Sequence, residues 1–222
     1  MLASVDGRIV TEGWPLSAEG RRQYEEVHAA YDADGWLCGR VTMEQHFATS
    51  VRPDEEIARE HQGAPRESFI ASGQHASYAF VVDPHGKLRW ESADLDGDHL
   101  VVILSERVSD DYLTELREHG VSYLIAGAKT VDLERALDEI GARLGVRTLM
   151  LEGGGGINGT MLRAGLVDEV SLLVAPIVDG RVGLASLFDV HGAGFTPRRL
   201  ALEHVERRAD DMLWLRYRLE SP

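Results

Sequence analysis

The sequence contains one cysteine, Cys38, and only two lysines, Lys87 and Lys129, among its 222 residues. A single cysteine excludes an internal disulfide framework and any multi-cysteine zinc or iron-sulfur cluster, so we expect no metal site. No stretch approaches the ~18 consecutive apolar residues of a membrane span, and the N-terminus lacks the basic and apolar regions of a signal peptide. We therefore expect a protein of the reducing cytoplasm that has no contact with a membrane.

Basic side chains are also few: 37 acidic side chains outnumber 23 basic ones and give a formal net charge of −14. This balance opposes binding to nucleic acid, which depends on many lysine and arginine contacts to phosphates. It does not exclude a single phosphorylated ligand, since a few arginines and helix N-termini can form a locally positive pocket. A nucleotide cofactor is compatible with the composition, and arginines and backbone amides would meet its phosphates.

Short apolar runs alternate with amphipathic segments, and no proline-rich linker or low-complexity tract divides the chain, so we interpret residues 1–222 as one domain. The candidate strands are Met1–Val5, Gly35–Cys38, Tyr78–Val82, Leu100–Leu104, Ser122–Ile125, Thr148–Leu151 and Glu169–Ala175. The candidate helices are Ala18–Tyr31 with Ser17 as N-cap, a segment from Ser109 or Asp110 to about His119, and Asp132–Leu144.

The end of the chain has a different pattern. Leu200–Arg207 and Met212–Leu219 are strand-like and are separated by a short polar turn, which predicts an antiparallel hairpin. Several earlier strands are too continuously apolar to have a solvent-exposed face. Such a pattern is typical of strands that helices cover on both sides. Together these features predict an α/β fold, a three-layer sandwich around a mixed, mostly parallel sheet with a C-terminal hairpin.

The most informative motif is Leu149-Met150-Leu151-Glu152-Gly153-Gly154-Gly155-Gly156-Ile157-Asn158-Gly159, which places four glycines between an apolar strand and an apparent helix at Thr160–Ala164. Without Cβ atoms the backbone can approach a ligand closely, and N–H groups at a helix start can point at a pyrophosphate. A tight strand-to-helix turn is the alternative interpretation. The run comes too late in the chain for the usual dinucleotide fingerprint and carries no Walker lysine.

Two shorter motifs also follow strands. In Cys38-Gly39-Arg40-Val41-Thr42-Met43-Glu44, glycine permits a turn, and the arginine and threonine can bond phosphate oxygens, although in a helix's first turn both are solvated more often than not. In Ser4-Val5-Asp6-Gly7-Arg8, the polar residues indicate either a β-turn or a site.

The order of these motifs resembles the reductase domain of riboflavin biosynthesis, the C-terminal half of the bifunctional deaminase-reductase, in the dihydrofolate-reductase-like superfamily. The resemblance rests on SVDGRI, GRVT, LSER and LEGGGGINGTMLRAGLVDE, and covers nearly the whole chain. It implies an NADPH-dependent reductase, a homodimer, that reduces the ribosyl group of a phosphoribosylamino-pyrimidine to ribityl. No deaminase domain is present in these residues.

The resemblance also implies roles for particular residues. Gly153, Gly154, Gly155 and Gly156 would take the cofactor pyrophosphate beside Ile157, with a cis peptide between the first two glycines. Gly39, Arg40 and Thr42 match the GRxT that lies against cofactor phosphates, and Ser105 and Arg107 stand where the superfamily meets the 2′-phosphate. Ser4 and Asp6 would line the nicotinamide and substrate end, with Asp6 as the catalytic candidate that orients the acceptor or relays a proton through water.

One departure bears on the substrate. After GxxT the riboflavin enzymes continue with an acidic residue before proline, whereas this chain reads Met43-Glu44-Gln45-His46-Phe47. A reductase on the same scaffold that acts on another heterocycle or a carbonyl compound is therefore the alternative function. Scattered histidines (His46, His61, His75, His85, His191 and His204) lack metal-ligand spacing and are expected at the surface, and Cys38 is expected to be a small buried hydrophobe.

Overall fold

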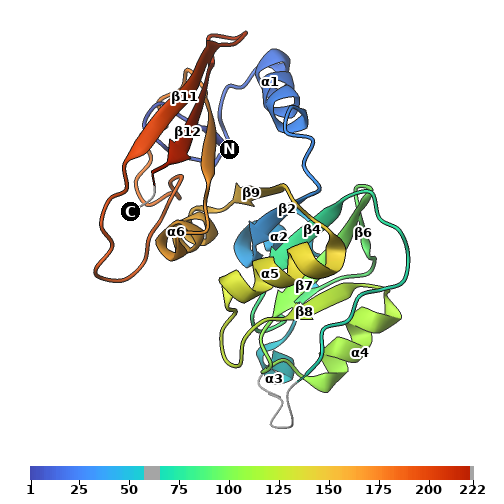
Figure 1. The fold of residues 1–222 in the computed structure, drawn as a ribbon. Coiled ribbons are helices and arrows are strands. Elements are labelled where there is room, and N and C mark those ends of the chain that lie inside the picture. The colour runs from blue at the N-terminus through green and yellow to red at the C-terminus, as the bar shows by residue number, and fades with distance from the viewer. Residues whose placement is uncertain (58–65, 221–222) are drawn as a thin grey trace. The chain divides into compact units, whose positions relative to one another are not determined.

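The computed structural model describes residues 1–57 and 66–220. The chain forms two compact units, and each is described by itself (Figure 1). The central unit comprises Ala33–Glu152, and the end unit combines Met1–Asp32 with Gly153–Pro222. The expected single domain over 1–222 stays a prediction.

The central unit is built on a six-stranded sheet in the order β6-β7-β4-β2-β9, with β8 paired to β7. Its strands are β2 (Gly35–Gly39), β4 (Tyr78–Val82), β6 (Asp94–Leu95), β7 (Asp98–Leu104), β8 (Ser122–Ile125) and β9 (Leu149–Gly153). The pairs β2/β4, β4/β7 and β7/β8 are parallel, whereas β6 is antiparallel to β7. A parallel core of this kind matches the continuously apolar strands of the sequence.

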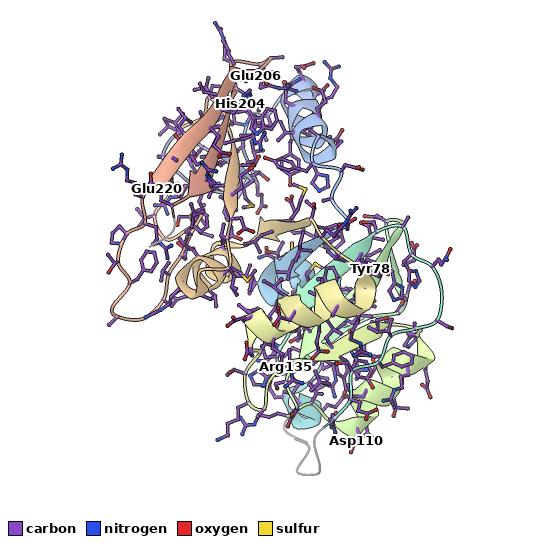
Figure 2. All side chains as sticks on the ribbon, viewed as in Figure 1. Tyr78, Asp110, Arg135, His204, Glu206 and Glu220 are labelled. Carbon is purple, nitrogen blue, oxygen red and sulfur yellow. The ribbon has the colours of Figure 1, made fainter. Side chains whose placement is uncertain are left out.

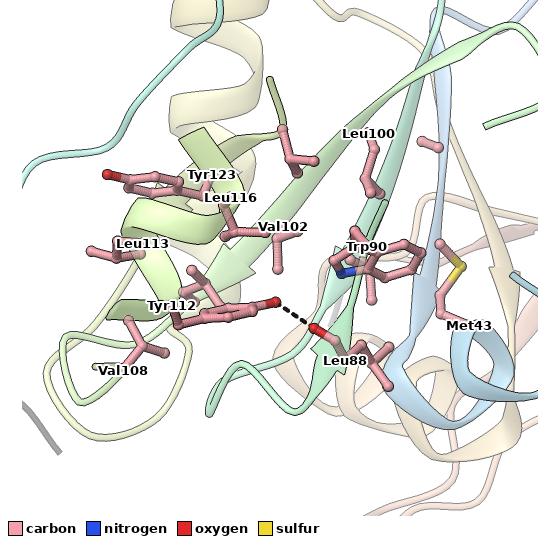
Figure 3. Packing of buried hydrophobic residues seen from close by; sticks show 14 of the residues in the cluster. Met43, Leu88, Trp90, Leu100, Val102, Val108, Tyr112, Leu113, Leu116 and Tyr123 are labelled. Carbon is pink, nitrogen blue, oxygen red and sulfur yellow. Dashed lines mark hydrogen bonds between the residues drawn. The ribbon is translucent and has the colours of Figure 1, made fainter. Parts of the chain in front are cut away.

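Both faces of this sheet are buried. On one face Val81, Leu100 and Val102 pack against Tyr112 and Leu116 of α4 (Asp110–Glu118), and Figure 3 shows part of this cluster. Residues of the other face are fully buried as well, namely Leu37, Phe80, Val101, Ile103 and Leu124. The remaining elements of the unit are α2 (Arg40–His46), β3 (Ser50–Val51), α3 (Asp54–Ile57), β5 (Leu88–Arg89) and α5 (Leu133–Leu144).

The end unit contains a four-stranded sheet in the order β1-β10-β12-β11. Its elements are β1 (Leu2–Ala3), α1 (Ala18–Ala29), α6 (Gly155–Ala164), β10 (Glu169–Val174), β11 (Leu200–Arg207) and β12 (Leu213–Leu219). β1 is parallel to β10, and β11 and β12 form the antiparallel hairpin that the alternating residues predict. On one face Leu173 packs with Val27 of α1 and with Met212 and Trp214.

Side-chain caps begin α1 and α4 at Ser17 and Ser109, as the sequence predicts, and Asp132, expected as the first residue of a helix, caps α5. The Ser17 hydroxyl accepts the Gly20 N–H at 2.9 Å, the Ser109 hydroxyl accepts the Tyr112 N–H, and Asp132 accepts the Arg135 N–H. The α/β class and the terminal hairpin are thus confirmed, but the strands of the described residues fall into separate sheets and not one continuous sheet. Within the same residues, no helix has the length and apolar character to cross a membrane.

Candidate functional site

Asp6 lies in the turn after β1 and accepts three hydrogen bonds. Its carboxylate accepts the Ser4 hydroxyl at 2.6 Å and the backbone N–H groups of Asp179 and Gly180 at 3.0 and 2.9 Å. The Ser4 hydroxyl, followed by these two amides, lowers the pKa of Asp6 to about 2. At neutral pH Asp6 is therefore an ionised acceptor that joins the first turn to the loop after β10.

Ser4 stabilises the same turn through its buried hydroxyl group. It is buried, and its hydroxyl accepts the Arg8 N–H at 2.9 Å while donating to Asp6. Asp179 extends the network, because it accepts the Trp14 indole N–H at 2.6 Å and three bonds from Arg181, one from its backbone N–H and two from its guanidinium. Both Asp6 and Asp179 thereby fix the loop around Gly180, and Trp14 is anchored by its ring nitrogen.

The glycine run has a different backbone from the one expected. The expected cis peptide between Gly153 and Gly154 is wrong, since no cis bond occurs in residues 1–57 and 66–220. The turn is made instead by positive φ angles of 104° at Gly153 and 47° at Gly154, a region that favours glycine. The helix then begins at Gly155, five residues before the expected Thr160.

Packing within the end unit requires a glycine at the third position of the run, Gly155. A Cβ at Gly155 would overlap the Ser186 carbonyl oxygen and the Asp189 carboxylate, and one at Gly159 would overlap the Asp189 carbonyl. Gly155 and Gly159 lie one helical turn apart, so they form a surface of α6 without side chains, against which residues 186–190 pack. The Asn158 amide secures this contact by donating to the Leu187 carbonyl oxygen at 2.8 Å.

Gly156 has room for a side-chain atom. The nearest atom to a Cβ built there is His191 Nε2 at 3.9 Å, an ordinary contact distance. The start of α6 has no side-chain cap, so the backbone N–H groups of Gly155, Gly156 and half-buried Ile157 receive no capping side chain. The α6 terminus is consequently suited to an anion.

In the central unit, three segments leave the carboxyl edge of the sheet next to one another. The strand register aligns Gly39 of β2 with Val82 of β4, and Val82 with Ile103 of β7. The segments that begin at Arg40, Asp83 and Ser105 therefore leave the sheet side by side. This arrangement brings the GRVT and LSER motifs to one edge, as their positions after parallel strands predict.

The residues of the GRVT motif have unequal exposure and partners. Gly39 has a φ of −77°, which any residue can adopt, so its turn does not require glycine. Arg40 forms an ion pair with Glu44 one helical turn further on, and the side chain of Arg40 keeps 31% of its surface exposed. Thr42 is half-buried in α2. Arg40 can reach a ligand only in competition with its own carboxylate partner.

Ser105 is fully buried, and its expected place beside the 2′-phosphate stays a prediction. Its hydroxyl donates to the Pro84 carbonyl oxygen at 2.7 Å and accepts the Arg107 N–H at 3.4 Å. Ser105 therefore shapes the turn, whereas half-buried Arg107 follows on the same segment. Of this pair, only Arg107 has side-chain surface for a ligand.

Asp83 is a buried acid at this edge that sequence reasoning missed. It is fully buried at the end of β4, its Oδ2 accepts the Leu88 N–H at 2.9 Å, and Oδ1 has no hydrogen-bond partner. Burial raises its pKa. The signal available in the sequence was a carboxylate directly after an apolar strand, the same position that identified Arg40 and Ser105.

The histidines are not all at the surface. His99 is buried, and half-buried His75 stacks on it with ring centroids 3.7 Å apart. Burial, followed by the charge of His75, lowers the pKa of His99 to about 4, and its Nε2 lies 2.7 Å from the Ser122 hydroxyl oxygen. His46, His85, His191 and His204 retain exposed or half-buried positions, and His61 lies outside the described residues.

Cys38 is buried, as expected for a small hydrophobe. Burial and then the Glu152 carboxylate raise the pKa of its thiol to about 12, so it has no nucleophilic role at neutral pH. Among residues 1–57 and 66–220, no three histidine, cysteine or carboxylate side chains are grouped for a metal ion.

The fold places this chain among α/β proteins of the dihydrofolate-reductase-like kind. A pyrimidine reductase-like protein from Corynebacterium diphtheriae superposes with a TM-score of 0.71 at 19% identity, covering 100% of this chain and 90% of that one. RibD from Acinetobacter baumannii superposes with a TM-score of 0.64 at 17% identity, covering 99% of this chain and 56% of that one.

The RibD C-terminal domain family matches residues 1–214, and the chain belongs to this family. Two curated relatives carry the name 2,5-diamino-6-ribosylamino-4(3H)-pyrimidinone 5′-phosphate reductase. The protein from Aquifex aeolicus is 33% identical over 95 residues, covering 43% of this chain and 41% of the relative. The protein from Methanothermobacter thermautotrophicus is 37% identical over 92 residues, covering 41% of this chain and 42% of the relative. The similarity thus spans about two fifths of each relative's length.

Proposed function

We propose that this protein is an NADPH-dependent reductase that converts the ribosyl group of a phosphoribosylamino-pyrimidine to a ribityl group. Membership of the RibD C-terminal domain family and the names of the curated relatives support this reaction. The structural observation that carries the cofactor part is the α6 terminus, which has no side-chain cap and has room for a side-chain atom at Gly156.

Each unit, taken by itself, carries groups suited to the phosphates of such a cofactor. In the end unit the first-turn N–H groups of α6 would bind the pyrophosphate, because a helix N-terminus favours negative charge. In the central unit Arg107 would meet the 2′-phosphate that distinguishes NADPH from NADH, and Arg40 and Thr42 would lie against the cofactor phosphates. When bound, NADPH supplies the hydride that reduces the sugar carbon.

Asp6 would act by position. Because its pKa is about 2, it is ionised at neutral pH and has no proton to donate. Of the two roles that the sequence leaves open for Asp6, the contacts favour orienting the acceptor over relaying a proton. Asp6 and Ser4 hold the loop around Gly180, so the polar groups of that loop keep a fixed direction toward a substrate.

We further propose that the protein forms a homodimer in the cytoplasm. Cross-strand partners share a face of the end-unit sheet, and one face carries Leu202, Val205 and Leu213, which are 56%, 58% and 41% exposed. The opposite face, with Leu173 and Trp214, packs with α1. An exposed apolar sheet face of this kind favours a second copy of the chain as its cover.

The reaction is tested by mixing the purified protein with NADPH and the ribosylamino-pyrimidine 5′-phosphate and following NADPH oxidation by absorbance. Turnover with formation of the ribityl product supports the proposal. Tight NADPH binding without turnover of this substrate would instead favour the alternative, a reductase for another heterocycle or carbonyl compound. Absence of NADPH binding would overturn the cofactor assignment itself.

A further inference from the structure

The segment Ser105–Asp110 connects β7 to α4 and carries Arg107. Its first half is fixed to the neighbouring turns of the central unit. The Ser105 N–H and hydroxyl both donate to the Pro84 carbonyl oxygen, at 3.1 and 2.7 Å, and the Glu106 N–H donates to the Gly127 carbonyl oxygen at 2.9 Å. The backbone is thus fixed immediately before Arg107.

Two buried arginines fix the second half. Arg52 donates to the Gly86 carbonyl oxygen at 2.7 Å and to the Ser109 hydroxyl at 3.2 Å, so it joins the turn after β4 to the start of α4. Arg66 donates to the Val108 carbonyl oxygen and forms an ion pair with Asp110. Asp110 is labelled in Figure 2, and its side chain is 76% exposed, whereas that of Arg66 is 7% exposed.

Burying the guanidinium groups of Arg52 and Arg66 costs free energy. The need to fill space does not explain why arginine occupies these two positions. The side chain of Arg52 is 3% exposed, its guanidinium lies 4.4 Å from the centroid of the Tyr112 ring, and its Nε lies 3.5 Å from Glu56. Figure 3 shows Tyr112 beside Val108 in the apolar cluster. Apolar side chains of similar volume can fill such a space as stably, so a buried guanidinium is better explained by the geometry that its planar fork imposes.

The geometry points to a functional role for this arrangement: we propose that Arg52 and Arg66 are positioning residues that hold Arg107 at the 2′-phosphate of NADPH and thereby set the preference for NADPH over NADH. This inference rests on the proposed function, because it assumes that Arg107 meets that phosphate. Neither arginine touches the cofactor, so each acts through the 105–110 segment.

The test measures the dissociation constants of NADH and NADPH and expresses the preference as their ratio. Arg52→Lys keeps the charge but cannot span Gly86 and Ser109, and we expect the ratio to fall at least fivefold while the melting temperature stays within a few degrees. Arg89→Lys is the matched control, because Arg89 pairs with Glu56 and Glu115 and makes no hydrogen bond to the 105–110 segment. Its ratio should change less than twofold.

A double-mutant cycle shows whether the effect passes through Arg107. Arg107→Ala should abolish most of the preference, and adding Arg52→Lys to it should change the ratio no further. If Arg52→Lys does not fold, Arg66→Lys takes its place with the same expected fall.

The outcomes separate the two proposals. If Arg107→Ala lowers the ratio but Arg52→Lys and Arg66→Lys do not, the positioning role is overturned and the proposed function stands. If Arg52→Lys lowers the ratio equally in the Arg107→Ala background, the positioning role is also overturned. A ratio that Arg107→Ala leaves unchanged, or a ratio of one in the unaltered protein, overturns the 2′-phosphate assignment on which both depend.

Discussion

The Asp6 carboxylate accepts the backbone N–H of Asp179 at 3.0 Å, although the two residues lie 173 positions apart in the chain. With the Gly180 N–H as a second donor, Asp6 closes the loop that follows β10 onto the turn that follows β1. The loop geometry therefore depends on one ionised side chain.

Asp6→Asn should lower kcat at least tenfold and leave the melting temperature within a few degrees. An asparagine keeps one acceptor oxygen, but its NH₂ group would face a backbone donor, so one of the two loop contacts is lost. Steady-state kinetics with saturating NADPH measure the effect, and Glu25→Gln on α1 is the charge-matched control.

Because the pKa of Asp6 is about 2, its contribution to loop stability is present above the ordinary value of 3.8 and is lost only as the pH falls toward 2. A rate that depends on an acidic group titrating near pH 6 and that disappears in Asp6→Asn would contradict the orienting role.

The neighbouring glycines Gly155 and Gly156 should respond differently to the same added methyl group. Gly155→Ala forces a Cβ into the Ser186 carbonyl oxygen and should lower the free energy of unfolding by about 1–3 kcal/mol, the usual cost of overpacking. Gly156→Ala meets only His191 at 3.9 Å, so it should fold normally and bind NADPH at least fivefold more weakly. Chemical denaturation and fluorescence titration measure the two effects. Unchanged NADPH affinity in Gly156→Ala would place the pyrophosphate elsewhere.

The sequence predicted β4 and β8 to the residue: β4 is an unbroken apolar run between Ser77 and Asp83, and β8 lies within the largely apolar segment Val121–Ala126. It missed the true start of α6, since a glycine-rich segment has low helix propensity and its helical state depends on docking of residues 186–190, which lie some 30 positions away. The His75–His99 stack was missed for the same reason. Contacts between distant residues leave no local periodicity, and the resemblance implied a cis peptide in the glycine loop that residues 1–57 and 66–220 do not contain.

His99 should make the protein acid-sensitive. Its pKa is about 4 in the folded state against an ordinary 6.5, so between these values the unfolded chain binds a proton that the folded protein does not. The free energy of unfolding should therefore decrease as the pH falls from 6.5 to 4, by up to about 3 kcal/mol from this one group. His99→Gln cannot titrate and should show a shallower slope in urea denaturation measured at several pH values. His119→Gln at the exposed end of α4 should keep the original slope, and equal slopes in all three proteins would refute the assignment.

The exposed sheet face predicts a dimer that a single charge can dissociate. The unaltered protein should have about twice the 24.5 kDa chain mass in light scattering at micromolar concentration. Val205→Glu places a charge in the middle of the apolar face, so it should shift the protein to the monomer mass, whereas Glu25→Lys on α1 should not. A monomer in the unaltered protein, or a Val205→Glu protein that stays dimeric, would contradict this interface.

The Arg40–Glu44 ion pair predicts that removing the charge of Glu44 strengthens NADPH binding, whereas removing the charge of Arg40 weakens it. If Arg40 binds a cofactor phosphate, Glu44 competes for the same guanidinium, because the two side chains are paired within one turn of α2 and are 31% and 37% exposed. Glu44→Gln should then strengthen NADPH binding two- to fivefold, in keeping with the roughly 0.2–1 kcal/mol of an exposed ion pair, and the gain should shrink at high salt. Arg40→Ala should weaken binding, and Glu44→Gln added to it should restore nothing. Fluorescence titrations at low and high ionic strength measure all four proteins, and equal affinity in Glu44→Gln and the unaltered protein would show that Arg40 does not contact the cofactor.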